Sequence, residues 1–440
     1  MAAKQTNPTQ ALMAALLLVA AGCNGDGPAL SKSTAQPQES DFEAPQLGPI
    51  PDDAPLLGAL LSETPIYKSA HKKSKQIGSL RAGDVVRRSK KSHENDQCIA
   101  GWYAIAPRGY VCTEKSATTD TKHPTLLAMG LRPQLQGPLP YTYARTTGTT
   151  ALLHRHDKES VRLGGRLARS TVMAIVGSWT APDESKEPQR LGLRGDGHFV
   201  RADDLEAAAG SSFVGMVVSD DQKLPVAYVV RRGIRAWDVD GGSAQKRDLL
   251  QYHQRLELTG RYRTIAEQRF WATSEGYWVR HKDVTVVRKR YEFPDFVTKD
   301  QKWVDISVVT GSLVAYVGQK PVYATLVSVG RDRLGDPELT ASTPRGSFRV
   351  VQKLITRRQG SSPDQPLMDA PWAMLLENGT WLYSSPKHDR FGIEHTDGDI
   401  ELSPKDGLYL WKWSAPVVPE NWHGVHVADG DDTLIVNVRK

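Results

Sequence analysis

The stretch that decides the fold runs from residue 381 to residue 425 and reads WLYSSPKHDRFGIEHTDGDIELSPKDGLYLWKWSAPVVPENWHGV. Three blocks stand out in it: HDRFG at 388–392, LSPKD at 402–406 and WHGV at 422–425. Between the first two blocks, acidic residues occupy every second position, at Asp397, Asp399 and Glu401, with Glu394 and His395 close by. Residues two apart on a β-strand point to the same face. We therefore predict that these carboxylates share a face and that repulsion raises the pKa of one of them.

These blocks resemble the C-terminal signature of the L,D-transpeptidase (YkuD-type) catalytic domain, a family that cross-links bacterial peptidoglycan through a cysteine nucleophile. The family pattern is an upstream His, then His-Asp-x-Phe-Gly, then Ser-His-Gly-Cys followed by an apolar strand and Leu-Ser-x-x-Asp. The matching residues are His388, Asp389, Phe391, Gly392, Leu402, Ser403, Pro404 and Asp406. The resemblance implies a β-sandwich domain, which we place at residues 300–440.

The resemblance extends upstream and covers about residues 302–426. Apolar runs separated by polar turn residues predict a β-hairpin between Trp303 and Tyr323. The block TPRGSF at 343–348 resembles the family's Thr-Pro-x-Gly-x-Phe turn beside the substrate groove. The groove-scaffold positions that the resemblance implies are Thr343, Pro344, Gly346, His388, Asp389, Gly392 and Gly398.

The catalytic positions of the family are changed in this sequence. Asp399 stands where the family has its nucleophilic cysteine, Asp397 where it has the histidine of Ser-His-Gly-Cys, and Tyr383 where it has the upstream histidine. Acyl transfer needs an activated nucleophile, and a carboxylate is a poor one toward amides. Tyrosine, with an ordinary pKa of about 10, is a weak base at neutral pH. We therefore predict no working catalytic residue, only these three degenerate positions.

Composition places the chain among exported, soluble, multidomain proteins. It has 440 residues, of which 24% are charged and 39% hydrophobic, and the net charge is +6. This modest, dispersed excess fits an anionic envelope polymer and does not indicate a nucleic-acid partner. We predict neither a cofactor nor a metal.

The N-terminus carries targeting signals. Residues 1–23 read as a lipoprotein signal peptide whose apolar segment, 12–21, is too short to span a membrane. The Ala-Ala-Gly-Cys ending resembles a lipobox, which implies that Cys23 is lipidated; an ordinary signal peptide is the alternative. Residues 24–57 are polar and read as a disordered tether. We therefore predict a cell-envelope protein anchored by a lipid in the periplasm or at the outer membrane.

The middle of the chain reads as small β modules. Residues 58–117 resemble a bacterial SH3-like module, in which an exported protein would join Cys98 to Cys112 as a disulfide. A loose Gly-aromatic-Val repeat around Gly109, Gly197 and Gly276 suggests two further SH3-like modules. The remaining predicted segments are an irregular linker at 118–150 and the two further modules at 151–222 and 223–290.

The fold class predicted is therefore mainly β, with SH3-like barrels followed by an L,D-transpeptidase-like β-sandwich. The function predicted is a non-catalytic, wall-binding or regulatory envelope protein, whose partners are peptidoglycan stem peptides or an envelope protein. One alternative is an active L,D-transpeptidase. A second is a cation site at the acidic positions, where calcium would find oxygen ligands; a solvent-exposed segment without a ligand competes with it.

Overall fold

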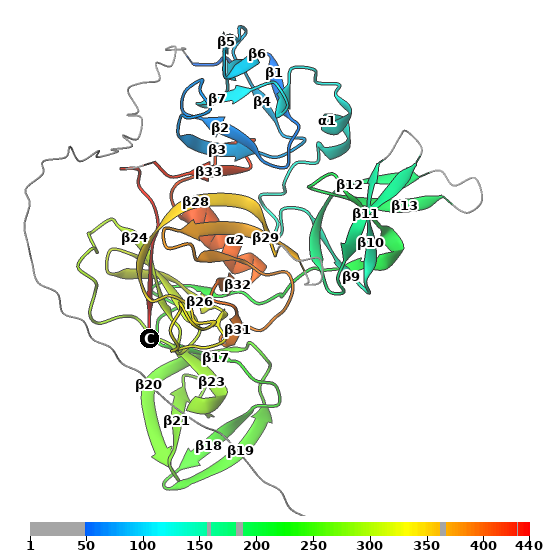
Figure 1. Ribbon diagram of the computed structural model, residues 1–440. Coiled ribbons are helices and arrows are strands. Elements are labelled where there is room, and N and C mark those ends of the chain that lie inside the picture. Colours follow the sequence, from blue (N-terminus) through cyan, green and yellow to red (C-terminus); the bar gives the residue numbers. More distant parts are fainter. Residues whose placement is uncertain (1–48, 156–159, 182–187, 361–366, 429) are drawn as a thin grey trace, which may run out of the picture. The chain divides into compact units, whose positions relative to one another are not determined.

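The computed structural model describes residues 49–155, 160–181, 188–360, 367–428 and 430–440 (Figure 1). The predicted signal peptide, Cys23 and most of the predicted tether lie outside these residues. Among the described residues, no helix is both long and apolar enough to cross a membrane. The described chain is mainly β, as predicted, and within it the α-helices are α1 (Pro124–Met129) and α2 (Pro404–Trp413).

Short strands form a first strand group, from Leu56 to Thr118. They are β1 (Leu56–Ala59), β2 (Thr64–Tyr67), β3 (Gln76–Leu80), β4 (Val85–Arg87), β5 (His93–Asn95), β6 (Cys98–Ala104), β7 (Tyr110–Cys112) and β8 (Ala117–Thr118). The Sγ atoms of Cys98 and Cys112 form a disulfide between the paired strands β6 and β7. The group begins inside the predicted tether, because Leu57 is buried in its core.

The second strand group runs from Thr142 to Ala207. It contains β9 (Thr142–Thr146), β10 (Thr150–Arg155), β11 (Val161–Leu167), β12 (Val172–Ala181), β13 (Gln189–Arg194), β14 (Phe199–Arg201), the 3-10 helix η2 (Ala202–Asp204) and β15 (Leu205–Ala207). The segment predicted as an irregular linker, 118–150, contains both α1 and β9. Helix α1 begins at a proline, whose fixed φ suits the first helical position, after the side-chain cap of His123. β16 (Met216–Val217) follows and pairs with a strand of the C-terminal domain, β26 (Lys320–Leu326).

The third strand group runs from Val226 to Val287. It contains β17 (Val226–Val229), β18 (Arg235–Asp240), β19 (Ser243–Leu249), β20 (Arg255–Ile265), β21 (Gln268–Thr273), β22 (Trp278–Arg280), the 3-10 helix η3 (His281–Asp283) and β23 (Val284–Val287). The repeat seen in the sequence has a common local structure: Gly197 and Gly276 have φ of 82° and 87° and precede a strand, a 3-10 turn and another strand. An SH3-like fold for the three groups stays a prediction.

The C-terminal domain carries the stretch quoted first. Its strands are β24 (Lys302–Ser307), β25 (Ser312–Val317), β26 (Lys320–Leu326), β27 (Val329–Gly330), β28 (Gly346–Gln359), β29 (Met368–Leu376), β30 (Trp381–Ser384), β31 (Glu394–Thr396), β32 (Ile400–Leu402), β33 (Gly424–His426) and β34 (Ile435–Arg439). The predicted hairpin is present, since β24 pairs antiparallel with β25 over its whole length.

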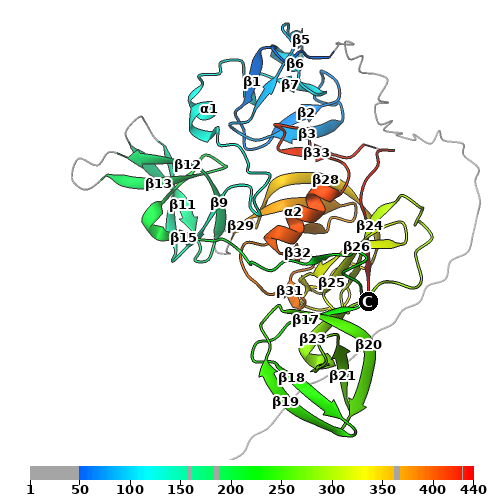
Figure 2. The ribbon, with the colours of Figure 1, turned by 180° about the vertical axis from the view of Figure 1, so that it is seen from behind.

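The core of this domain lies under helix α2. Strand β29 reads MDAPWAMLL and is buried along nearly its whole length, as expected for a strand covered on both faces. Ser403 caps α2 by accepting a hydrogen bond from the Asp406 N–H, and Pro404 takes the first helical position. Figure 2 shows α2 lying along β28 and β29. Strand β33 then pairs with β28 on one side and with β3 of the first strand group on the other.

Candidate functional site

The three positions predicted to be degenerate, Tyr383, Asp397 and Asp399, lie around two neighbouring strands. β30 pairs antiparallel with β29 and parallel with β32, which sets Tyr383 opposite Glu401. Between β31 and β32 the chain turns at Gly398, whose φ of 118° is open to glycine and strained for other residues. The turn carries Asp397 and Asp399 on its two sides.

The predicted shared face of acidic residues is wrong. Asp397 and Asp399 lie in the turn and not on a strand, so the alternation breaks at Gly398. The Asp397 side chain is 80% exposed and forms an ion pair with Arg331. Asp399 turns inward, and Glu401 on β32 faces a different set of partners. A cation site built from these three carboxylates therefore has no basis in the geometry.

Asp399 is held by the strands beneath it. Its Oδ1 accepts the Trp381 backbone N–H at 3.0 Å, and its Oδ2 accepts from Gln359 Nε2 at 3.3 Å and lies 3.7 Å from Arg357 Nη1. Burial raises the pKa of Asp399, an effect that the Trp381 hydrogen bond and the Arg357 charge only partly offset. Both carboxylate oxygens are thus engaged as acceptors, which anchors the side chain.

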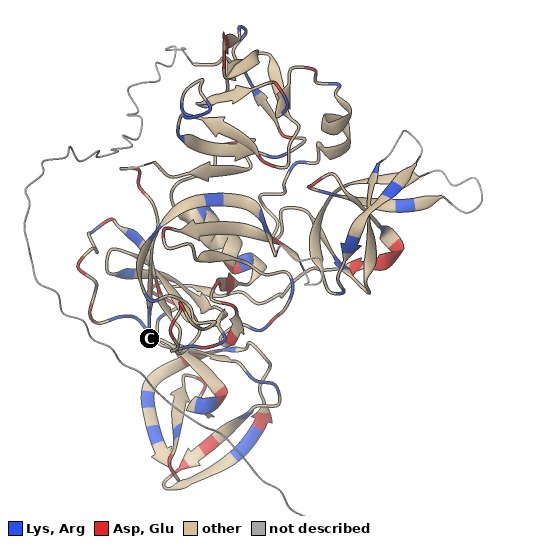
Figure 3. Ribbon diagram, in the orientation of Figure 1, with Lys and Arg blue, Asp and Glu red and all other residues tan. Residues whose placement is uncertain are grey.

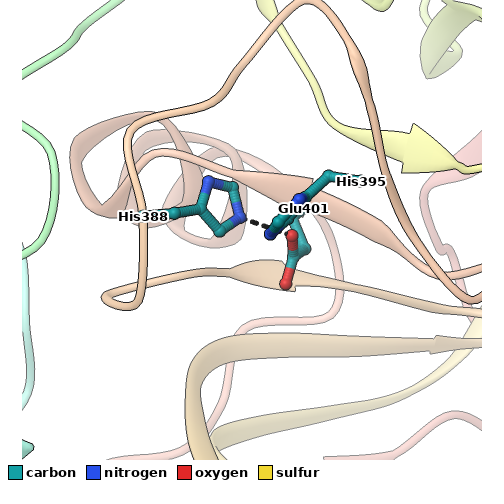
Figure 4. A group of neighbouring side chains, drawn as sticks. All are labelled: His388, His395 and Glu401. Carbon is teal, nitrogen blue, oxygen red and sulfur yellow. Dashed lines mark hydrogen bonds and ion pairs between the residues drawn. The ribbon is translucent and has the colours of Figure 1, made fainter. Parts of the chain in front are cut away.

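A second polar cluster forms around Glu401 (Figure 4). The Tyr383 hydroxyl donates to Oε1 at 3.2 Å, and His388 Nε2 donates to Oε2 at 2.6 Å. The His395 ring lies 4.1 Å from the His388 ring, centroid to centroid. We call Tyr383, His388, His395 and Glu401 the Glu401 cluster. His388, predicted as a scaffold residue only, belongs to it.

Burial and charge set the protonation states in the Glu401 cluster. Burial by itself raises the pKa of Glu401, but the hydrogen bond and charge of His388, with His395 and Tyr383, outweigh it and lower the pKa. Burial, followed by the charge of His388, lowers the pKa of His395. Burial and the Glu401 charge raise the pKa of Tyr383 well above 10, so its hydroxyl is a donor and not a base.

The donor set of this cluster has the composition of a metal site. One ligand atom each from His388, His395 and Glu401 lies within 4.8 Å of the others. However, His388 Nδ1 accepts the Arg390 backbone N–H at 2.9 Å, so Nε2 carries the ring hydrogen. In this arrangement His388 Nε2 is hydrogen-bonded to Glu401. The arrangement is that of a hydrogen-bonded cluster around one carboxylate.

The predicted scaffold residues fix loops near these clusters. Thr343 Oγ1 accepts the Gly330 N–H at 2.8 Å, just before Pro344. At Gly346 a Cβ would lie 2.8 Å from the Phe348 ring, which accounts for glycine there. The Asp389 carboxylate pairs with Arg232 at 3.1 Å and its carbonyl accepts from Tyr252, both on the third strand group.

Asp406, which is buried, organises the N-terminal end of α2. Its carboxylate accepts hydrogen bonds from the Gly215 N–H at 2.7 Å, Tyr323 Oη at 2.7 Å and Thr325 Oγ1 at 2.5 Å. Burial raises the pKa of Asp406, against the lowering effect of these donors. We call these residues the Asp406 network. It ties α2 to β26 and to the segment after the second strand group.

A cavity of about 320 Å³ is lined in part by two neighbours of Asp399. Arg357 and Trp381, the neighbours of Asp399, are among its lining residues. The Arg357 guanidinium also stacks over the Trp381 ring, 4.2 Å from its centroid. Sequence reasoning missed Arg357, because nothing in the pattern separates it from the other 55 of the 56 Lys and Arg residues. Only the pairing of β28 with β29, and of β29 with β30, places it beside Asp399.

Comparison with known proteins identifies the C-terminal domain. Residues 301–433 match the family model described as the L,D-transpeptidase catalytic domain, YkuD. This part of the chain is therefore a domain of the L,D-transpeptidase catalytic family. No curated protein matches the chain.

Solved structures of L,D-transpeptidases are similar to the chain over part of its length. One from Stackebrandtia nassauensis is 17% identical, with a TM-score of 0.24 over 34% of this chain and 62% of that one. One from Xylanimonas cellulosilytica is 16% identical, with a TM-score of 0.22 over 34% of this chain and 65% of that one. One from Mycobacterium smegmatis is 18% identical, with a TM-score of 0.25 over 41% and 77%. At such TM-scores the assignment rests on the match over residues 301–433.

Proposed function

We propose that this protein binds peptidoglycan stem peptides in the cell envelope through its L,D-transpeptidase-family domain and does not cross-link them. The observation that carries the proposal is the anchored carboxylate of Asp399 at the position where the resemblance puts the nucleophilic cysteine. Trp381, Gln359 and Arg357 all hold this side chain. The family of the domain supports peptide binding, and the chemistry of the site argues against acyl transfer.

The surroundings of Asp399 supply no replacement catalyst. A covalent acyl step needs a nucleophile and a base within hydrogen-bond reach. The Tyr383 hydroxyl is committed to Glu401, and its raised pKa keeps it protonated at neutral pH. Asp397 is exposed and paired with Arg331. The sequence has no cysteine after Cys112, and that one is in a disulfide.

The direct test is a cross-linking assay. The protein is incubated with tetrapeptide stems, and cross-linked dimers are sought by mass spectrometry beside an active L,D-transpeptidase as positive control. We expect no dimers, and none with Asp399→Cys either, because the restored thiol would still face Tyr383 instead of a histidine. Dimers from the unaltered protein would show it to be an active transpeptidase.

Wall binding is tested separately with purified sacculi. We expect the protein to sediment with sacculi and to be released by soluble stem peptides. Asp397→Asn serves as a matched control, since it changes an exposed charge in the same turn as Asp399. If the protein stays in the supernatant, the wall is not its ligand, and an envelope protein becomes the partner to seek.

We also propose envelope localisation through lipidation of Cys23, which lies outside the described residues. The supporting observations are the apolar segment at 12–21 and the small residues before Cys23. Replacing Cys23 by serine should move the protein from the membrane fraction to the soluble envelope fraction. An unchanged distribution would remove the lipid anchor from the proposal.

A further inference from the structure

The cavity beside Asp399 is built by three parts of the chain. The first strand group contributes Arg81 and the exposed Glu63; the second contributes Ala174, with Tyr141 directly before its first strand; the C-terminal domain contributes Arg357 and His423. At about 320 Å³, it is at the lower end of the range of about 300–1,000 Å³ for small-molecule sites. Its ligand would therefore be small.

Arg81 is the most unusual residue of this cavity. It is only 3% exposed, and it forms no ion pair with a carboxylate within the described residues. Its Nη2 donates to the carbonyls of Met129 and Leu131 at 3.4 and 3.1 Å, while Nε and Nη1 have no partner. The guanidinium lies 4.6 Å from the centroid of the Tyr141 ring. The charge of Asp84 reaches this group, but the Asp84 carboxylate accepts the Arg81 backbone N–H at 2.7 Å and forms no ion pair with the guanidinium within the described residues. Buried N–H donors without an acceptor are costly, so Nε and Nη1 call for an anionic acceptor.

The other charges in the cavity do not neutralise Arg81. Asp369 accepts the Ala174 N–H at 3.0 Å and lies 3.4 Å from Arg358, which also pairs with Asp196 at 2.8 Å. Glu63 is exposed at the rim. Lys and Arg residues occur in each strand group and in the C-terminal domain (Figure 3), and in this cavity Nε and Nη1 of Arg81 remain without an acceptor among the described residues.

His423 offers the complementary group. It is buried, and its Nε2 donates to the Thr356 carbonyl at 2.9 Å, which leaves a lone pair on Nδ1. Burial lowers the pKa of His423 to about 4, so the ring is neutral at pH 7. Among the described residues, neither Nδ1 nor the Tyr141 hydroxyl has a hydrogen-bond partner. The cavity thus presents cationic donors and a neutral acceptor together.

We propose that this cavity binds the C-terminal end of a short peptide. Arg81 takes the terminal carboxylate, and His423 Nδ1 accepts a peptide N–H near that end. An inorganic anion would satisfy Arg81 but has no N–H donor for His423. This inference rests on the proposed function and specifies it: the recognised part of a stem peptide is its free carboxyl end, and the site includes residues outside the family domain.

Calorimetric titration of the whole protein tests the proposal. The probes are the stem tetrapeptide, the same peptide with its terminal carboxylate capped as an amide, and inorganic phosphate. We expect the amide cap to weaken binding at least tenfold, and millimolar phosphate to leave tetrapeptide binding within twofold. Equal affinity of the unaltered protein for the tetrapeptide and for its amide-capped form would by itself overturn the proposal. Full displacement by phosphate would show an unspecific anion site and would also overturn it.

Two variants locate the binding. Arg81→Gln should weaken tetrapeptide binding at least tenfold, and Tyr141→Phe, which removes only the unpaired hydroxyl, about threefold. Arg331→Gln changes an exposed arginine of the C-terminal domain and should leave affinity unchanged. If Arg81→Gln and Tyr141→Phe both bind like the unaltered protein, the peptide binds elsewhere and the proposal fails.

The same preparations separate this inference from the proposed function. If sacculi retain the protein but the tetrapeptide and its amide bind with equal affinity, wall binding stands and the carboxylate site is refuted. If sacculi do not retain the protein but free tetrapeptide binds through Arg81, the carboxylate site stands and wall binding is refuted.

Discussion

The Asp406 network and the cavity beside Asp399, which contains Arg81, are two buried polar regions. They differ in whether their polar atoms have hydrogen-bond partners. In the network, the Asp406 carboxylate accepts a hydrogen bond from each donor that faces it, on Gly215, Tyr323 and Thr325. In the cavity, nitrogen atoms of Arg81 and His423 have no partner. A buried polar group is costly unless it is hydrogen-bonded. The network therefore stabilises the fold, whereas the cavity is completed only by something that binds.

The largest expected effect comes from breaking the network. Asp406→Ala leaves three buried donors without an acceptor, each costing about 1–3 kcal/mol, so the free energy of unfolding should fall by about 3–5 kcal/mol. Urea denaturation followed by tryptophan fluorescence measures this. The isosteric Asp406→Asn keeps one acceptor oxygen and should lose less. A loss under about 1 kcal/mol for Asp406→Ala would show that the network does not stabilise the fold.

The Glu401 cluster is a second region in which the buried carboxylate is hydrogen-bonded, and its contribution to the stability of the fold should depend on pH. Glu401→Gln removes the charge that His388 and Tyr383 contact, at a cost of about 1–3 kcal/mol at pH 7. The pKa of Glu401 is lower in the folded protein than its ordinary value of 4.5, so at a pH below about 4.5 the unfolded state binds more protons than the folded state. The stabilisation is thus present above pH 4.5 and lost as pH falls through the folded pKa. Urea denaturation of both proteins between pH 3 and 7 should show the difference shrinking toward acid.

An opposite result is expected in the cavity. Arg81→Met removes a buried charge that forms no ion pair, together with the two Nη2 hydrogen bonds to the Met129 and Leu131 carbonyls, so the free energy of unfolding without ligand should fall by at most about 2 kcal/mol. The unaltered protein, but not the variant, should gain thermal stability when tetrapeptide is added. A loss of several kcal/mol in the absence of peptide would make Arg81 a structural residue like Asp406, and the contrast between the two regions would disappear.

The smallest effect is expected at the surface. Asp397→Asn breaks an exposed ion pair with Arg331, and such pairs contribute little, so stability should change by less than about 0.5 kcal/mol. Peptide binding should also be unchanged. A clear loss of binding would mean that the turn at Gly398 takes part in the site.

The sequence predicted the C-terminal domain well because its signal is local. The hairpin between Trp303 and Tyr323, the mainly β class and the family stretch at about 302–426 all follow from short contiguous blocks, and the family match spans 301–433. The shared face of Asp397, Asp399 and Glu401 was predicted wrongly, because one residue with positive φ, Gly398, ends the alternation.

The polar sites were harder to predict because their members are far apart in the chain. Glu401 meets His388 and Tyr383 only because β30 lies parallel to β32. Arg81 and His423 come into one cavity because β33 pairs with both β3 and β28. No spacing in the sequence marks such residues as neighbours.

By itself, the sequence determined the family match of the C-terminal domain and predicted a changed nucleophile position, since both depend on which residue types stand in which order. Tertiary structure alone decided which polar groups are paired and which are left open. Pairing depends on strand register and on burial, and these are properties of the folded chain as a whole.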